Sequence, residues 1–339
     1  MGGRAGRARR VTAADVALAA GVSTTTVSLV VNGKDTRRVL PETRQRVLAE
    51  ARRLGYQVDR RARSLATGRS GIVGFAATGL SNSFFGSVQM GLLEEFGDRV
   101  QMLSVATEVG HTGARANMTT LLSVGVDGVI VEADALDVVG DRPPVPIVLL
   151  DSPGGPQEFV RVNFDLTTGA DSLAAHLLEL GHRRIGYLQA GRNGSTFAVR
   201  FKAFADRIRA AGGTVVEATS AINIEGASER MLKVWPEWDA LGVTAIVCAC
   251  DVLAYGTLDI LRSLGVGVPD RVALASFDDL PTAALMNPAL TCVHLPALEL
   301  GRQAARVFLD VLAGNTAARE VVLPSTLVVR ASTGPVAGR

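Results

Sequence analysis

Short apolar runs alternate with longer helical segments along residues 71–339, and this alternation restricts the region to few folds. Strands that alternate with helices form parallel sheets joined by right-handed crossovers, so the region is predicted to be α/β. Amphipathic segments such as 167–182 and 252–265 separate most of the runs. The predicted strands are 72–78, 100–106, 127–133, 146–151, 159–165, 184–190, 244–251, 272–279 and 291–295.

The predicted strand ends form a candidate binding site. In open parallel sheets, ligands bind beyond the carboxyl ends of the strands. Acids stand at three of these ends, as Asp151, Asp251 and the pair Asp278-Asp279. Arg200 begins a predicted helix after a loop rich in Gly and Ser. Each acid alone is better explained as a cap of the following helix or turn, whereas their equivalent positions and Arg200 favour a site.

Residues 11–55 read as three short helices. Thr12 is expected to cap the first, Gly21 to end it, and Ser23 to cap the second, over 24–31. The third is predicted over 41–54. Two short helices joined by a tight turn with Gly are typical of a helix-turn-helix. On spacing alone, an amphipathic helix pair without a ligand remains the alternative.

Three consecutive threonines, 24–26, open the second of these helices although β-branched residues lower helix propensity. Short hydroxyl side chains there suit phosphates and base edges, and a Thr methyl suits a thymine methyl. Residues 1–70 hold 15 of the 35 Lys and Arg but only 5 of the 33 Asp and Glu. This basic head predicts a polyanionic partner, and together with the helix-turn-helix pattern it indicates double-stranded DNA. Residues 1–10 alone also read as a solvated tail.

Other classes of protein find little support in the sequence. Cys248, Cys250 and Cys292 have neither the number nor the spacing for a disulfide framework or a metal site, and no cofactor is predicted. The N-terminus lacks the apolar core of a secretory signal, and no run of 18 apolar residues occurs. We therefore expect a cytoplasmic, nucleoid-associated protein without a membrane partner.

The segments ADVALAAGVSTTTVSLVVNG, PETRQRVLAEARRLGY and RRARSLATGRSGIVGF resemble the LacI/GalR family of bacterial transcriptional regulators, and the resemblance continues almost to the last residue. It implies a small all-α helix-turn-helix DNA-binding domain, then an α/β two-lobed periplasmic-binding-protein-like domain with two parallel-sheet, Rossmann-like subdomains. The expected boundaries are a basic disordered tail 1–10, a DNA-binding domain 11–57, a hinge helix or linker 58–70 and an effector-binding and dimerisation domain 71–339. Lobe 1 would hold about 71–162 and 294–323, and lobe 2 about 163–293 and 324–339.

On the DNA side, the resemblance implies that Thr24, Thr25 and Leu29 open the recognition helix and that Leu65 is a minor-groove wedge. Family members often carry Arg at the position of Leu29, and leucine cannot make its bidentate contact with guanine, so the operator is expected to differ there. Leu40 replaces a capping Ser, and Val58-Asp59 replaces Pro-Asn. The full set of expected DNA contacts is Thr12, Ser23, Thr24, Thr25, Thr26, Ser28, Leu29, Asn32, Arg60, Arg63, Ser64 and Leu65.

On the effector side, the resemblance implies that Arg200 and Asp278 clamp a sugar-like ligand. Cys250 stands where the family usually has Asn, and Ile224 where many relatives have a stacking aromatic. Both changes make the cleft less polar and less aromatic, so the ligand is expected to be smaller or less hydroxylated than a simple hexose, or absent. The expected effector contacts are Ser81, Asn82, Phe84, Phe85, Asp151, Arg200, Ile224, Cys250 and Asp278.

These observations predict a homodimeric, ligand-responsive repressor on a pseudo-palindromic operator, and not an enzyme. Ligand would change the lobe geometry and shift the hinge between ordered and disordered states. The alternatives are a regulator controlled by a protein partner or by no effector, a sugar-binding transport protein, and a sugar-processing enzyme. Adjacent acids such as Asp278-Asp279 cannot straddle a glycosidic bond. Several apolar residues suit either a dimer face or the core: Met90, Leu92, Leu93, Met118, Leu121 and Leu122.

Overall fold

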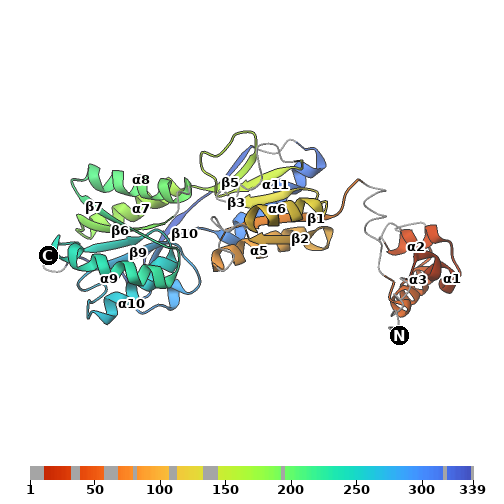
Figure 1. Ribbon diagram of the computed structural model, residues 1–339, viewed down its shortest axis with the longest axis horizontal. Coiled ribbons are helices and arrows are strands. Elements are labelled where there is room, and N and C mark those ends of the chain that lie inside the picture. The colour runs from red at the N-terminus through yellow and green to blue at the C-terminus, as the bar shows by residue number, and fades with distance from the viewer. Residues whose placement is uncertain are drawn as a thin grey trace, which may run out of the picture. The chain divides into compact units, whose positions relative to one another are not determined.

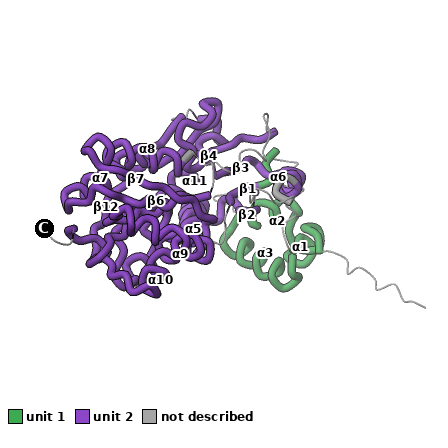
Figure 2. The backbone as a smooth tube through the Cα atoms, turned by 60° about the vertical axis from the view of Figure 1, so that its left-hand side comes forward, with its two compact units in different colours: residues 1–70 green, residues 71–339 purple. Residues whose placement is uncertain are grey.

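The computed structural model describes residues 11–31, 39–56, 68–78, 82–106, 113–132, 144–191, 195–315 and 319–336. The chain divides into two units, residues 1–70 and 71–339 (Figure 2). Several predictions lie outside the described residues, namely the tail 1–10, most of the hinge, and the side chains of Asn32, Arg60, Arg63, Ser64, Leu65 and Ser81.

Three helices form the first unit, α1 (Ala13–Ala20), α2 (Thr24–Val31) and α3 (Pro41–Leu54). The predicted caps are confirmed. Thr12 and Asp15 form a reciprocal capping box at the start of α1, and Gly21 ends that helix with φ 63°. The Thr26 amide donates to Ser23 Oγ at 3.1 Å. The helices pack through small apolar residues, which are Val16, Ala17, Ala20, Val27, Val30, Val47 and Ala51.

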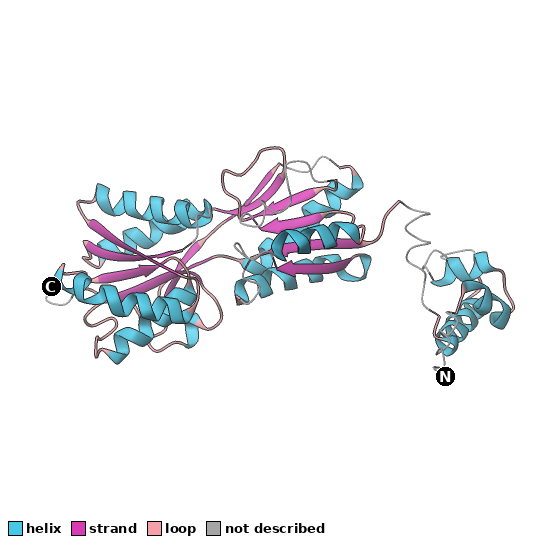
Figure 3. Ribbon diagram, viewed as in Figure 1, coloured by secondary structure: helices cyan, strands magenta, loops and turns pink. Residues whose placement is uncertain are grey.

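The second unit holds two six-stranded sheets (Figures 1 and 3). The lobe 1 sheet has the order β11-β5-β4-β3-β1-β2, and all of its pairings are parallel. Its strands are β1 (Ile72–Ala77), β2 (Gln101–Ala106), β3 (Val129–Glu132), β4 (Ile147–Leu150), β5 (Val160–Phe164) and β11 (Glu320–Leu323).

The lobe 2 sheet has the order β12-β10-β9-β8-β6-β7. Its pairings are parallel except for β12, which runs antiparallel to β10 and pairs Val293 with Leu327. Its strands are β6 (Arg184–Ala190), β7 (Thr214–Ser220), β8 (Ala245–Cys248), β9 (Ala273–Asp278), β10 (Thr291–His294) and β12 (Thr326–Val328). Every predicted strand is therefore present, whereas β7, β11 and β12 were not predicted.

Helices cover both faces of each sheet. In lobe 2, α7 and α8 lie on one face and α9 and α10 on the other (Figure 1). In lobe 1, successive β1 residues face opposite sides, so Phe75 joins the core beside α5 and α11 while Ala76 joins the core beside α6. The helices are α5 (Ser83–Phe96), α6 (Gly113–Ser123), α7 (Leu166–Glu179), α8 (Ser195–Ala210), α9 (Ile224–Ala240), α10 (Asp251–Ser263) and α11 (Ala297–Ala313), with short 3₁₀ turns η1 (Gly97–Arg99) and η3 (Ala283–Leu285).

The residues that suited either a dimer face or the core differ in burial. Leu92, Met118 and Leu121 are buried, whereas Met90 and Leu93 on α5 are 53% and 47% exposed. Leu122 is partly buried against the core of α6. The inner side of α5 faces α11, so its outer side carries an apolar surface that this chain leaves uncovered.

The chain passes between the two lobes three times in the described residues. The crossings follow β5, β10 and β11, at residues 165, 295–296 and 324–325. Neither lobe is therefore continuous in sequence. Within the same ranges, no helix by itself is long and apolar enough to cross a membrane; α1 and α2 pass that test only when taken together, and they are bent by 103°.

Candidate functional site

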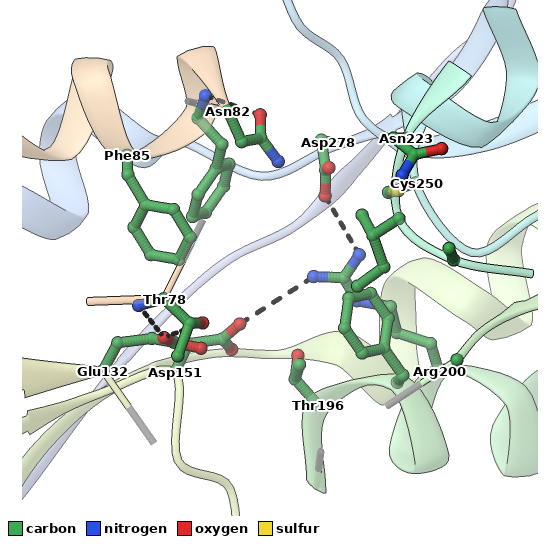
Figure 4. A pocket seen from close by; sticks show the side chains of 15 residues that line it. Thr78, Asn82, Phe85, Glu132, Asp151, Thr196, Arg200, Asn223, Cys250 and Asp278 are labelled. Atoms are coloured by element: carbon green, nitrogen blue, oxygen red, sulfur yellow. Dashed lines mark hydrogen bonds and ion pairs between the residues drawn. The ribbon is translucent and has the colours of Figure 1, made fainter. Parts of the chain in front are cut away.

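A cavity of about 400 Å³ is lined by residues of both lobes (Figure 4). Lobe 1 contributes the ends of β1, β3 and β4 and the start of α5, and lobe 2 contributes α8 and the residues that follow β6 to β9. The lining residues are Thr78, Asn82, Phe84, Phe85, Glu132, Asp151, Gly191, Thr196, Phe197, Arg200, Ala221, Ile222, Asn223, Cys250 and Asp278. Most of the predicted effector contacts therefore meet in one pocket.

Arg200 lies at the centre of this pocket, with its side chain only 3% exposed. Its Nη1 donates to Asp278 Oδ1 and to the Ala249 carbonyl, both at 3.0 Å. Its Nη2 lies 3.8 Å from Asp151 Oδ2 of the other lobe (Figure 4). Its Nε has no hydrogen-bond partner in the described part of the chain. One guanidinium thus spans the two lobes, and not all of its donors are satisfied by the described residues.

Burial and ion pairing both shift the pKa values of Arg200 and Asp278. Burial raises the pKa of Asp278, and the Arg200 guanidinium acts in the opposite direction. Burial by itself would lower the pKa of Arg200, but Asp278 and Asp151 more than compensate and raise it. The guanidinium therefore stays charged, and it holds two carboxylates in place around the cavity.

Two pocket acids adopt a backbone conformation that is uncommon outside glycine. Asp151, just after β4, has φ 46°, and Asp278, at the end of β9, has φ 104°. Non-glycine residues with positive φ are rare and cost free energy, although Asp tolerates this region better than most. Such strain concentrates at binding sites. In both lobes, the turn that follows a central strand presents an acid to the cavity.

Several pocket residues were not predicted from the sequence. Glu132 at the end of β3 is buried and accepts hydrogen bonds from the amide of Thr78 at 2.9 Å and from its hydroxyl at 2.5 Å. The strand-end rule that identified Asp151 would also have found Glu132. Thr196 and Phe197 lie one helical turn before Arg200, and the buried Thr196 hydroxyl has no hydrogen-bond partner in the described residues. Helical spacing from Arg200 would have indicated both.

Two expectations about pocket residues need correction. Ile224 does not line the cavity, because it is the first residue of α9 with its side chain 46% exposed; Ile222, in the turn before α9, lines it instead. Asp251 does not line it either. Its carboxylate is fully buried, where it accepts from the Leu280 amide at 2.6 Å and from Ser276 Oγ. Asp251 therefore organises the turn after β9.

Three of the five predicted DNA-contacting side chains of α2 are exposed. Thr24, Thr25 and Ser28 are exposed on the outer side of the helix, while Thr26 and Leu29 are half-buried. Val27 and Val30 occupy its inner side. As expected from the loss of a capping residue, Leu40 precedes α3 without a side-chain cap. The helix thus presents a row of hydroxyl groups to solvent above an apolar base.

In the described residues, no group of His, Cys, Asp and Glu side chains is arranged to hold a metal ion. Cys248, Cys250 and Cys292 are buried free thiols. Burial raises the pKa of all three.

Comparison with known proteins links both units to one kind of regulator. Residues 12–59 match the model of bacterial regulatory proteins of the lacI family, and residues 174–333 match that of a periplasmic binding protein-like domain. The HTH-type transcriptional regulator DegA of Bacillus subtilis is 30% identical over 342 residues, which cover 96% of this chain and 99% of DegA.

Solved structures share the fold over the same length. A Lac repressor dimer bound to operator and the anti-inducer ONPF superimposes with a TM-score of 0.84 at 24% identity, covering 96% of this chain and all of that one. A complex of the transcriptional regulator CelR with cellobiose gives a TM-score of 0.70 at 27% identity and covers 95% of this chain and all of that one.

Proposed function

Because the chain belongs to the lacI family of bacterial regulatory proteins, in which its relatives are transcriptional regulators rather than enzymes, we propose that it represses transcription as a homodimer under the control of a small polyhydroxylated effector. Its DNA-binding helix-turn-helix and effector domain are those of the family. The proposal also includes the chemical class of the effector, the homodimer, the pseudo-palindromic operator and a location on the nucleoid in the cytoplasm.

The arrangement of Arg200 carries the effector half of the proposal. A buried guanidinium is bracketed by Asp278 of its own lobe and Asp151 of the other lobe, at the centre of a cavity that both lobes line. Fixed donors and acceptors in this order suit the hydroxyl groups of a polyol. A ligand held there contacts both lobes at once, so its binding changes the relative stability of different lobe arrangements. Cellobiose binding by the similar regulator CelR is in keeping with this class of ligand.

The exposed hydroxyls of α2 support the DNA half of the proposal. Thr24, Thr25 and Ser28 are exposed and carry hydroxyl groups of the kind that contact phosphates and base edges, and Leu29 offers an apolar contact in place of a guanine-reading side chain. Two such helices in a twofold dimer read a pseudo-palindrome. Leu65, outside the described residues, is proposed as the wedge at its centre.

Uncovered apolar residues support a dimer. Met90 and Leu93 lie on the outer side of α5 in lobe 1, and Leu285 in η3 of lobe 2 is 82% exposed. Exposed apolar patches of this kind mark interaction surfaces. The Lac repressor dimer that shares this fold is bound to its operator in that form.

Thermal unfolding of the full-length protein with a panel of sugars, polyols, sugar phosphates and nucleosides tests the effector half. A ligand at about a hundred times its dissociation constant stabilises the folded state by about 2.7 kcal/mol. We expect at least one neutral polyol to raise the melting temperature and Arg200→Ala to abolish that shift. A panel without any shift on a well-folded protein would favour control by a protein partner.

Selection of binding sites from random duplex DNA tests the DNA half. We expect a pseudo-palindromic consensus whose affinity, measured by fluorescence anisotropy, falls with Thr24→Ala and Thr25→Ala. The ligand found by thermal unfolding should then change operator affinity at fixed salt concentration. If the affinity is the same with and without ligand, control by that ligand is wrong even though DNA binding stands.

A further inference from the structure

Resting on the proposed function, we infer that the effector is a deoxy sugar or related methyl-bearing polyol, whose methyl group packs against Cys250. The inference depends on an apolar part of the pocket, the Cys250 corner, defined by Phe197, Ala221, Ile222 and Cys250. All four residues line the cavity and belong to lobe 2. Cys250 therefore selects among ligands that Arg200 alone would treat alike.

The pocket has two chemically different sides. Arg200 lies between Cys250 on one side and Asp151, Glu132 and Thr78 on the other (Figure 4). The second side also carries Phe85, and Glu132 already accepts from Thr78. The carboxylates of Asp151 and Glu132 nevertheless keep oxygens that suit ring hydroxyl groups. Ile222 and Phe197 pack against the main apolar core, of which Cys250 is a buried member. A ligand that matches both sides has hydroxyls along one edge and an apolar group on the opposite edge.

Close packing of two helices builds the Cys250 corner. A Cβ atom added at Gly256 on α10 would lie 2.3 Å from the Ile224 carbonyl oxygen, so the start of α9 rests directly on α10. Ser228 Oγ also donates to the Gly256 carbonyl at 3.3 Å. This contact fixes the turn that carries Ile222 relative to Cys250, at the start of α10. The corner is therefore a rigid feature of lobe 2.

Polar groups near the corner are weak or already engaged. Burial raises the pKa of the Cys250 thiol, which stays neutral and is a poor hydrogen-bonding group. Asn223 Oδ1 accepts from the Gly226 amide at 2.6 Å and caps α9. Asp278 and the Asn223 amide line the cavity near Cys250, so the inference concerns only the ligand group that meets the thiol itself. A hydroxyl pressed against the thiol would lose its water for a weak partner, whereas a methyl group would gain contact area.

Isothermal titration calorimetry of the full-length protein with matched sugars tests this inference. The pairs are D-galactose with D-fucose, D-glucose with 6-deoxy-D-glucose, and L-mannose with L-rhamnose, and each differs by one hydroxyl group. When an apolar pocket discriminates against a ligand with one additional hydroxyl group, the two affinities differ by about ten- to hundredfold. We expect at least one 6-deoxy sugar to bind at least about tenfold more tightly than its parent.

Variants locate the preference. Cys250→Asn and the smaller change Cys250→Ser should both reduce the ratio of affinities by supplying a hydrogen-bond partner for the extra hydroxyl. Cys248→Ser is the matched control, because Cys248 is buried in β8 outside the cavity lining, and it should leave the ratio unchanged. Melting curves without ligand report whether each variant folds.

The possible failures are distinguishable. If every parent sugar that binds does so as tightly as its 6-deoxy partner and Arg200→Ala abolishes the binding of both, the inference is overturned and the proposed function stands. An unchanged ratio in both Cys250 variants would overturn the role of this residue. If no member of any pair binds to folded protein but another polyol of the wider panel does, the inference fails and the proposed function stands. If the wider panel gives no ligand either, the proposed polyol effector fails as well.

Discussion

Arg200 makes the neighbouring Asp278 indispensable to the ligand-free protein. Their 3.0 Å ion pair is almost fully buried, and removing one partner of such a pair costs about 3–5 kcal/mol because the other charge stays buried. We expect Asp278→Ala to lower the free energy of unfolding in urea by about 3 kcal/mol. Asp278→Asn, which keeps an acceptor oxygen, should lose less. Equal losses in the two variants would show that the hydrogen bond contributes nothing.

Another single residue, His182, links stability to pH. It is buried, with Nδ1 3.0 Å from Thr244 Oγ1 and Nε2 3.0 Å from the Gly334 carbonyl oxygen, and burial lowers its pKa below the usual 6.5. Its neutral form therefore stabilises the fold fully above about pH 6.5, and this contribution is lost as the pH falls through the lower, folded-state pKa. We expect His182→Gln to lose less stability than the wild type on acidification from pH 7 to 5. Parallel curves from urea unfolding would contradict this role.

Among the elements, α5 and α11 cross unusually closely. A Cβ atom at Gly301 would lie 2.0 Å from the Val88 carbonyl oxygen, and one at Gly91 would lie 2.0 Å from that of Leu298. Gly→Ala normally stabilises a helix by about 1 kcal/mol, but here the backbones must separate. We expect Gly301→Ala to lower the melting temperature. Gly86→Ala in α5, where a Cβ meets nothing within 4 Å, should raise it. A stabilising Gly301→Ala would contradict the close crossing.

Strands that are buried on both faces were the easiest to predict, because they appear in the sequence as long apolar runs. Strands such as β6 and β9 lie inside a sheet, so both of their faces are apolar and their runs stand out. The edge strand β7 mixes exposed and buried residues, and β12 has only three residues whose pairing depends on β10. The pairing of β7 and β12 is fixed by distant partners, which a local pattern does not reveal. The edge strand β2 is also largely exposed, but its mostly apolar run made it recognisable.

The pocket could be predicted in part for a similar reason. Asp151 and Asp278 follow strands and were recognisable from that position. Asp251 also follows a strand, yet its side chain bonds the Leu280 amide beneath the pocket, because helix α10 begins with it and sets its direction. Ile222 lines the pocket and Ile224 does not, because Asn223 caps α9 and Ile224 is already the first residue of that helix. The direction of a side chain depends on helix starts, which sequence places only to within a few residues.

At the scale of the whole molecule, the region proposed to bind DNA and the region proposed to bind the effector have opposite net charges. Residues 1–70 carry ten more basic than acidic residues, whereas residues 71–339 carry eight more acidic than basic residues. Operator binding should fall by about a hundredfold or more between about 50 and 200 mM salt, because counterions are released from DNA. Binding of a neutral ligand in the buried pocket should change little over this range. Anisotropy and calorimetry measure the two, and a similar salt dependence for both would contradict this separation.

The three crossings between the lobes also set the order in which a ribosome can complete them. Most of lobe 2 lies between residues 166 and 294, whereas lobe 1 still needs α11 and β11, which end at Leu323. Lobe 1 is begun first during synthesis and finished after most of lobe 2. Until α11 emerges, the apolar side of α5 that receives it faces water. The regulator therefore has its longest exposure to chaperones and proteases in lobe 1, and a chain cut short by only the last tenth of its length leaves both lobes incomplete.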